Sequence, residues 1–159
     1  MKKLLIALIA VGVVAVGFLF FSSGSQSRLE GEIVEVRTLE VQPTAAVALV
    51  NFEATNVTSR PFVAYDRRLE LVDPDGKRLV GKIVQGVDLQ DLFKYFPQLG
   101  AMKNEPFLHE GTIEGGETRR GLIAARFEVP EAQIQARDRL VLRLVDGANR
   151  PSELTESSE

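Results

Sequence analysis

Hydrophobic residues follow two different patterns along this chain. Residues 4–21, LLIALIAVGVVAVGFLFF, form an unbroken apolar run. From Leu29 to Gly147 the apolar residues instead come in short runs, and several of these runs alternate apolar with polar positions. Alternation over four to eight residues is typical of half-buried β-strands, and a long apolar run is typical of a membrane-length helix. The pattern therefore predicts an N-terminal helix followed by a β-rich domain.

Particular segments of this domain predict particular strands. Val34 and Val36 alternate with charged residues, as in an edge or half-buried strand. Residues 45–50 are apolar at every position, which indicates a central strand covered on both faces. Residues 139–145 alternate leucines with Arg or Val and predict a last strand. Six or seven short strands separated by turns predict an antiparallel β-sandwich.

Turn signals divide these strands. Residues 73–76, DPDG, predict a hairpin turn, because the proline presets φ and the glycine tolerates positive φ. Gly115 and Gly116 predict a second turn before a long strand. Residues 130–136, PEAQIQA, predict one helical turn that begins near its proline.

Residues 87–111 interrupt the strands with a helical pattern. Its apolar stripe, spaced i, i+3, i+4, i+7, consists of Leu89, Leu92, Phe93 and Phe96. Asp88 is expected to cap the N-terminus, Val87 to pack against Leu92 as a hydrophobic staple, and Pro97 to end the helix. Such a short helix is not stable alone, so the stripe must pack on something.

Two partners are open for this stripe. The first is the chain's own sandwich, with the helix covering an open end or face. The second is another molecule, in which case Phe93, Tyr95 and Phe96 are the candidate partner contacts.

Several short motifs also resemble a known family. They are Asn56 after a strand, Asp73 with Gly76, Gly116 with Glu117, and Phe127, Val129 and Pro130 at a strand end. This series resembles bacterial extracytoplasmic immunoglobulin-like domains of unknown function, which are lipoproteins or membrane-anchored proteins and are related to a secreted mycobacterial antigen. The resemblance implies an immunoglobulin-like β-sandwich and an exported location. It implies no catalytic or binding residue, and the 87–111 insert departs from the family pattern.

The N-terminal run is expected to be a transmembrane signal anchor. As a helix, residues 4–21 would reach about 27 Å, close to the hydrocarbon thickness of a bilayer. Lys2 and Lys3 precede it, and positive flanks stay in the cytoplasm. The expected order is a cytoplasmic stub (1–3), the anchor, and a flexible linker (22–28). The β-domain would lie on the periplasmic or extracellular side of the cell membrane. The alternative is a secreted protein after signal cleavage.

Charge and composition narrow the partners. Two of the 19 basic residues and none of the 22 acidic residues precede residue 22, so the remainder carries a formal charge of about −5. This charge argues against nucleic-acid binding. The acidic end, residues 148–159, has little to bury and is expected to be a disordered tail. The domain is therefore assigned to residues 29–147.

The residues that carry chemistry are sparse. The chain has no Cys and one His, His109, so the nitrogen and sulfur ligands of a zinc site are missing. The serines lie almost entirely in the terminal segments, and no G-x-S-x-G motif occurs. Arg67-Arg68, Lys77-Arg78 and Arg119-Arg120 form either one anion-binding patch or solvated strand edges. We expect no catalytic residue, metal or cofactor.

Three functional hypotheses follow. The first is a non-catalytic binding or scaffolding module of the cell envelope, anchored in the lipid bilayer through residues 4–21 and contacting an envelope protein. The second is a small envelope enzyme or ligand carrier with a pocket near the 87–111 insert. The third is a stress-protective sandwich domain.

Overall fold

Eight of the ten strands in the described part of the chain, residues 28–156 of this computed structural model, belong to one sheet. The elements are β1 (Leu29–Gln42), β2 (Ala45–Asn56), β3 (Phe62–Ala64), β4 (Asp66–Val72), β5 (Arg78–Val80), β6 (Lys82–Ile83), α2 (Gly86–Tyr95), the 3-10 helix η1 (Pro97–Leu99), β7 (Gly111–Ile113), β8 (Thr118–Phe127), α3 (Glu131–Gln135), β9 (Arg139–Val145) and β10 (Pro151–Glu156). The prediction of a mainly β domain with a short inserted helix is confirmed.

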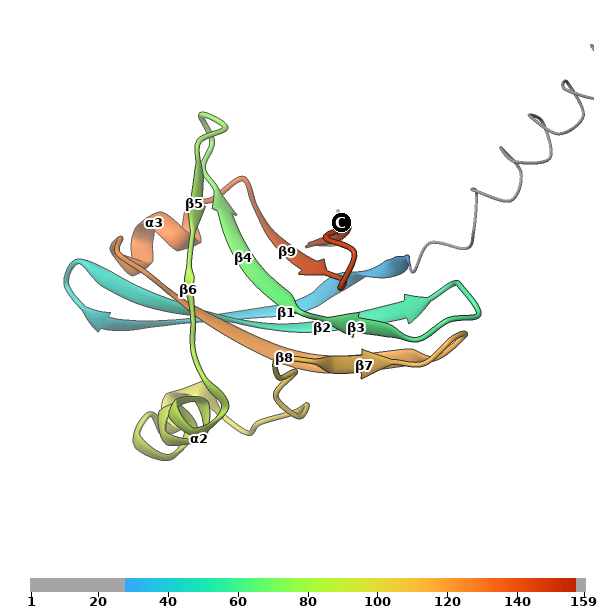
Figure 1. Cartoon of the computed structure of the whole chain (residues 1–159). Coiled ribbons are helices and arrows are strands. Elements are labelled where there is room, and N and C mark those ends of the chain that lie inside the picture. The colour runs from blue at the N-terminus through green and yellow to red at the C-terminus, as the bar shows by residue number, and fades with distance from the viewer. Residues whose placement is uncertain (1–27, 157–159) are drawn as a thin grey trace, which may run out of the picture.

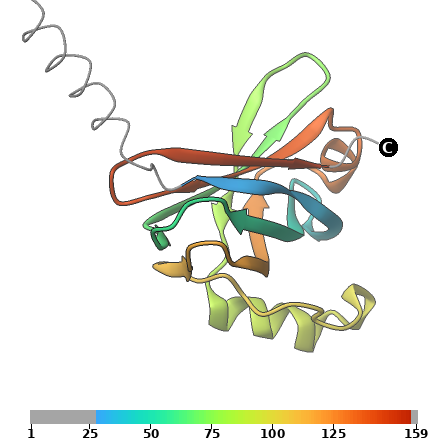
Figure 2. The same cartoon turned by 90° about the vertical axis from the view of Figure 1, so that its right-hand side faces the viewer.

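The large sheet curls until its two ends meet. Its strand order is β5-β4-β9-β10-β1-β2-β8-β6, and β3 with β7 forms a separate two-stranded sheet. The end strands β5 and β6 are consecutive in the chain and are separated only by Gly81, so one segment joins β4 on one side to β8 on the other. The result is a strongly curved, barrel-like sheet (Figures 1 and 2). β10 pairs with β1 in parallel, so the expected fully antiparallel order is wrong at this pair.

Gly81 permits this closure. A Cβ atom at this position would lie 2.7 Å from the Ala125 Cβ and 2.7 Å from the Phe127 Cζ, closer than packed carbons approach. The Gly81 amide donates a hydrogen bond to the Leu69 carbonyl at 2.9 Å, which holds the segment to β4 between the two short strands. A side chain here would push the closing segment away from the core.

β2 is covered on both faces, as residues 45–50 predicted. Its inward side chains, which belong to the main core, are Ala46, Ala48, Val50, Phe52 and Ala54. Val47 and Leu49 point outward into a second, smaller core on the outside of the sheet. Burial on both faces requires apolar residues at consecutive positions, which is why this segment does not alternate.

Helix α2 forms the cover of the outer face. Leu89 is fully buried, and its neighbours in the outer core are Leu39, Leu49, Leu99, Leu122 and Ala124. The interpretation that the insert covers a face of the chain's own sheet is confirmed. The helix ends at Tyr95, before Pro97, as predicted.

The start of α2 differs from the prediction. The N-cap is Gln85, without a side-chain hydrogen bond, and Asp88 lies in the first turn. The proposed staple is also wrong, because Val87 is already helical and is 74% exposed. The loop between β6 and α2 is short, and the helix begins at Gly86. Asp88, the predicted cap, is therefore already inside the helix.

The hairpin turn at residues 73–76 was predicted correctly, whereas the burial of Val34 was not. The hairpin between β4 and β5 is confirmed, with Gly76 at φ 82° and the Asp73 side chain accepting the amide hydrogens of Asp75 and Lys77. The alternation of Val34 and Val36 is wrong. A register shift between Ile33 and Glu35 leaves Val34 51% exposed while Val36 packs on the core.

The prediction of a disordered tail over residues 148–159 is wrong for β10. This strand lies between β9 and β1, with Leu154 opposite Leu142 and fully buried. The Leu29 amide donates to Ser152 Oγ at 3.2 Å. Arg137 pairs with Glu156, whose carboxylate also accepts the Leu140 amide hydrogen. Two buried side chains and one ion pair are enough to hold a strand that has neighbours on both sides.

The expectations for residues 1–3 and 4–21, and for nearly all of the 22–28 linker, lie outside the described residues. Within residues 28–156, no helix has the length and apolar character needed to cross a bilayer. The relationship to immunoglobulin-like domains stays a prediction.

Candidate binding groove

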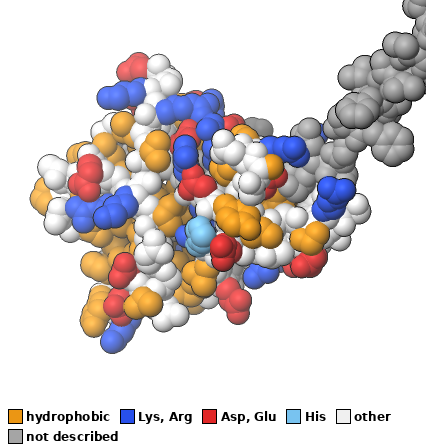
Figure 3. All heavy atoms as spheres, viewed as in Figure 1, with side chains coloured by type: hydrophobic (Ala, Val, Ile, Leu, Met, Phe, Trp, Pro, Cys, Tyr) orange, Lys and Arg blue, Asp and Glu red, His pale blue; other side chains and the backbone are white. Residues whose placement is uncertain are grey.

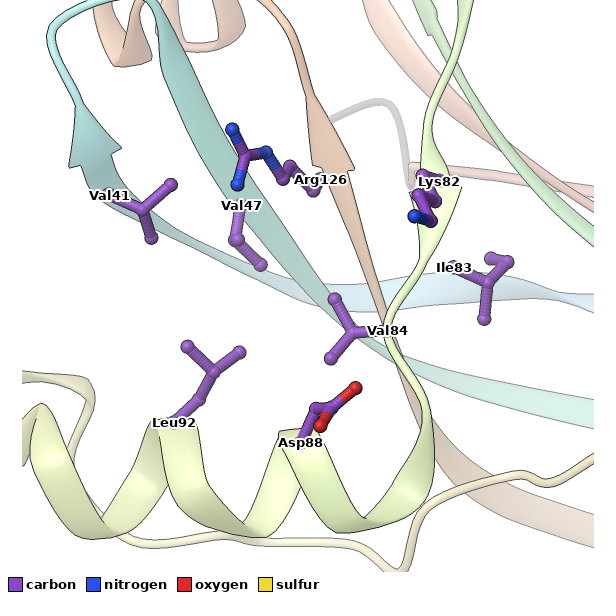
Figure 4. Close-up of a pocket in the computed structure, with 8 residues that line it drawn as sticks. All are labelled: Val41, Val47, Lys82, Ile83, Val84, Asp88, Leu92 and Arg126. Atoms are coloured by element: carbon purple, nitrogen blue, oxygen red, sulfur yellow. The ribbon is translucent and has the colours of Figure 1, made fainter.

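A groove lies between α2 and the outer face of the sheet. Its volume is about 300 Å³, and its lining comes from β1, β2, β6, β8, α2 and the loop between β6 and α2. The lining residues, shown in Figure 4, are Val41, Val47, Lys82, Ile83, Val84, Asp88, Leu92 and Arg126. Hydrophobic side chains gather on this side of the molecule around α2 (Figure 3). The groove lies beside the area of β1, β2 and β8 that α2 covers.

The charged residues of the groove lie on opposite walls. Lys82 and Arg126 come from the strands, whereas Asp88 comes from the first turn of α2 (Figure 4). Arg126 Nε donates to a Glu128 carboxylate oxygen at 2.9 Å, and its Nη2 donates to the Gln42 side chain at 3.2 Å. Five apolar side chains complete the lining, so the arrangement suits a ligand with one apolar and one charged part.

A polar cluster fastens the end of the insert to β1 and β2. Asn51 is buried, and its amide donates to Glu35 at 2.8 Å while its carbonyl accepts from Asn104 at 2.9 Å. Lys103 Nζ lies 2.7 Å from the Glu35 carboxylate. The hydrogen bond from Lys103 lowers the pKa of Glu35, with the charge of Arg37 adding to it, although partial burial acts in the opposite direction.

Arg37 adds a second attachment. Its guanidinium donates to the backbone carbonyls of Leu99 and Ala101 and lies 5.3 Å from the centre of the Phe93 ring. Polar groups thus fix residues 99–104, which follow the helix, to β1 and β2. The helix that forms one wall of the groove is therefore held both by its own apolar face and by the chain that follows it.

The three predicted partner contacts do not form one face. Phe93 and Phe96 are half-buried and pack against the outer core, whereas Tyr95 is 65% exposed. Lys94 lies 5.0 Å from the Tyr95 ring centre. Most of the aromatic stripe is used to seat the helix, and contact of these residues with a partner stays a prediction.

His109 lies away from the groove, exposed beside Tyr65 with 6.4 Å between the ring centres. No group of three His, Cys, Asp or Glu side chains that could hold a metal ion occurs within residues 28–156.

The basic pairs are dispersed among separate acidic or backbone partners. Arg68 pairs with Asp66, Arg78 with Glu70, and Arg120 with Glu53. Burial lowers the pKa of Arg67, whose guanidinium donates to the Phe107 carbonyl. Arg68, Arg78 and Arg120 thus have separate carboxylate partners, and Arg67 is partly buried rather than part of a solvated strand edge.

A second hollow lies on the other side of α2, between its N-terminal half and residues 102–108. It is larger, about 620 Å³, but Lys103, the cation in its lining, already pairs with Glu35. The groove over Val47 therefore has the more distinctive combination of groups.

Lys82 and Arg126 were not singled out from the sequence. Their importance comes from their positions directly opposite each other in the β6–β8 ladder. Nothing in the local pattern around Lys82 indicates that pairing, since it depends on the closure of the sheet.

Comparisons with known proteins give no closer description. No family model matches the chain, and no curated protein matches it. A conserved hypothetical protein from Bacillus anthracis is 12% identical at a TM-score of 0.35, with 73% of this chain and 72% of that chain covered. An X-ray structure of a Northeast Structural Genomics Consortium target is 10% identical at a TM-score of 0.32, with 83% and 81% covered.

Proposed function

We propose that this chain is a non-catalytic binding module of the cell envelope, anchored by residues 4–21 and holding its ligand in the groove between α2 and the sheet. The observation that carries the proposal is the groove itself, an apolar hollow with charged residues on both walls. Its volume of about 300 Å³ lies at the lower end of the range for small-molecule sites.

The attachment of the insert supports this proposal. Leu89 seats the helix, and the contacts of Arg37 and Glu35 hold the returning chain. A preformed wall spares a ligand the cost of ordering it. The hollow also favours a ligand-carrier role over a scaffolding role, because its dimensions fit a small molecule rather than a protein surface.

The test is site-specific photo-crosslinking of the full chain in its native membrane. A benzophenone amino acid replaces Asp88, which lines the groove, or Lys94, which lies on the same helix but outside the groove lining. We expect adducts at position 88 that are absent at position 94. Small-molecule adducts identify a carrier, and protein adducts identify a scaffold.

Equal adducts at both positions, or none at position 88, would contradict a groove-centred function. The same preparation tests the anchor, which should retain the chain in membranes after an alkaline carbonate wash. Release of the chain by that wash would contradict membrane anchoring and leave the groove experiment valid.

A further inference from the structure

The two cationic residues of the groove occupy directly opposed backbone positions in the β6–β8 pair, with the Arg126 guanidinium directed toward Val47 (Figure 4). Lys82 and Arg126 are register partners in the antiparallel β6–β8 pair, and both line the groove. Like charges at directly opposed positions destabilise a strand pair. Arg126 has the Glu128 carboxylate beside it, but Lys82 makes no ion pair with any residue between 28 and 156.

A second opposed pair in the same sheet shows how the fold otherwise compensates this repulsion. Arg68 and Arg143 face each other between β4 and β9. Arg68 pairs with Asp66 at 2.7 Å, and Arg143 pairs with Glu153 at 2.5 Å and lies 3.8 Å from Glu70. There, three carboxylates serve three cations, because Glu70 also pairs with Arg78, whereas Glu128 is the one carboxylate within residues 28–156 that pairs with either Lys82 or Arg126.

We propose that the groove binds a single-chain fatty carboxylate, with its headgroup at Lys82 and Arg126 and its chain along the apolar side chains beside Leu92. This inference rests on the proposed function and names its ligand class. One unpaired lysine beside a partly compensated arginine matches one negative charge.

The opposite wall selects against a second negative charge. Asp88 faces the strands from α2 and forms no ion pair with either cation or with any other described residue (Figure 4). A carboxylate headgroup carries one charge at neutral pH, whereas a phosphate monoester carries nearly two and would be repelled by Asp88. The volume, about 300 Å³, is equivalent to roughly ten water-sized groups and fits one chain rather than two.

The experiment uses the full chain in phosphatidylcholine vesicles and a decanoic acid that carries a terminal diazirine. The matched probes are the corresponding alcohol and phosphate monoester. Labelling of peptides from the groove is quantified by mass spectrometry and normalised to the labelling of lipid. We expect the acid to label the groove about fivefold more than the alcohol, the range of a partly exposed ion pair.

Two single substitutions should act in opposite directions. Lys82→Gln should lower labelling by the acid about threefold to fivefold, and Asp88→Asn should raise labelling by the phosphate probe by a similar factor. Lys94→Gln, which removes a charge from the same helix outside the groove, should change neither. A variant that fails to fold would instead lose groove labelling by the acid, the alcohol and the phosphate probe alike.

Equal groove labelling by acid and alcohol, unaffected by Lys82→Gln, would overturn the carboxylate inference while leaving a groove that binds apolar chains. An unlabelled groove that still yields benzophenone adducts would assign the ligand to another class and would also overturn the inference. Absence of both signals would remove the proposed function itself.

Discussion

The 87–111 insert and the last strand, β10, differ in how well their sequences indicate their place in the fold. The insert has three phenylalanines, the single histidine and a regular helical stripe, yet its helix covers the outside of the sheet, and only Phe107 reaches the main core. β10 reads as a short polar tail, yet it lies inside the sheet between β9 and β1. An element that completes a sheet needs few apolar residues, because its neighbours and its backbone hydrogen bonds supply most of its contacts.

The two regions should also differ in how they respond to damage. Removal of an external cover exposes one face, whereas removal of a strand between two others separates the sheet. Three substitutions test this difference, and they are ordered by expected effect.

The largest effect should come from Leu154→Ala. Leu154 is fully buried opposite Leu142, so truncation leaves a cavity in the main core. We expect the free energy of unfolding to fall by about 3–4 kcal/mol. Chemical denaturation followed by circular dichroism measures this loss. Thr155→Ala, on the exposed side of the same strand, is the control and should change it by about 0.5 kcal/mol or less. A small effect of Leu154→Ala would mean that β10 does not contribute to the sheet.

An intermediate effect is expected from Leu89→Ala. Leu89 is the buried residue of α2, and its truncation weakens the contact of the helix with β2 and β8. We expect a loss of about 2–3 kcal/mol.

Hydrogen exchange distinguishes the two regions in this variant. Exchange should accelerate in residues 86–100 before it accelerates in the sheet, whereas Leu154→Ala should affect the sheet directly. Val87→Ala, at an exposed position of the same helix, is the control. Uniform acceleration throughout the domain would contradict the distinction between cover and sheet.

The smallest effect concerns Glu35. Its pKa is lowered in the folded state, chiefly by Lys103, so its stabilising contribution is present above its ordinary pKa of 4.5 and is lost as pH falls below that value. Glu35→Gln should cost up to about 1 kcal/mol at pH 7, and the difference from the unmodified chain should shrink near pH 3. Denaturation at both pH values measures it. Glu40→Gln, exposed on the same strand, is the control; an equal effect of both would remove the special role of Glu35.

The sequence predicted correctly those structural features that depend on neighbouring residues. The DPDG hairpin, the short helix after Pro130 and the two-sided burial of residues 45–50 all depend on residues adjacent in sequence. β10 was missed because its two buried residues are Ser152 and Leu154, of which Leu154 alone is apolar, so its sequence shows no apolar alternation.

The candidate groove was less predictable because it depends on long-range register. Lys82 meets Arg126 only after the chain has paired β5 with β4, passed Gly81 and paired β6 with β8. Asp88 was identified as a helix-start residue, but its place on a groove wall depends on how α2 lies on the sheet. The sequence could indicate that residues 87–111 form a helix with an apolar face. It could not indicate which side chains would line the groove beside that helix.

The position of β1 has a mechanical consequence. This long strand is hydrogen-bonded to β2 along its length and to β10 near its start. A force applied at Arg28 along the strand direction would load both ladders in shear, so many hydrogen bonds would have to break together rather than open one after another. The Arg28 end of β1 is therefore arranged to resist a force along the strand.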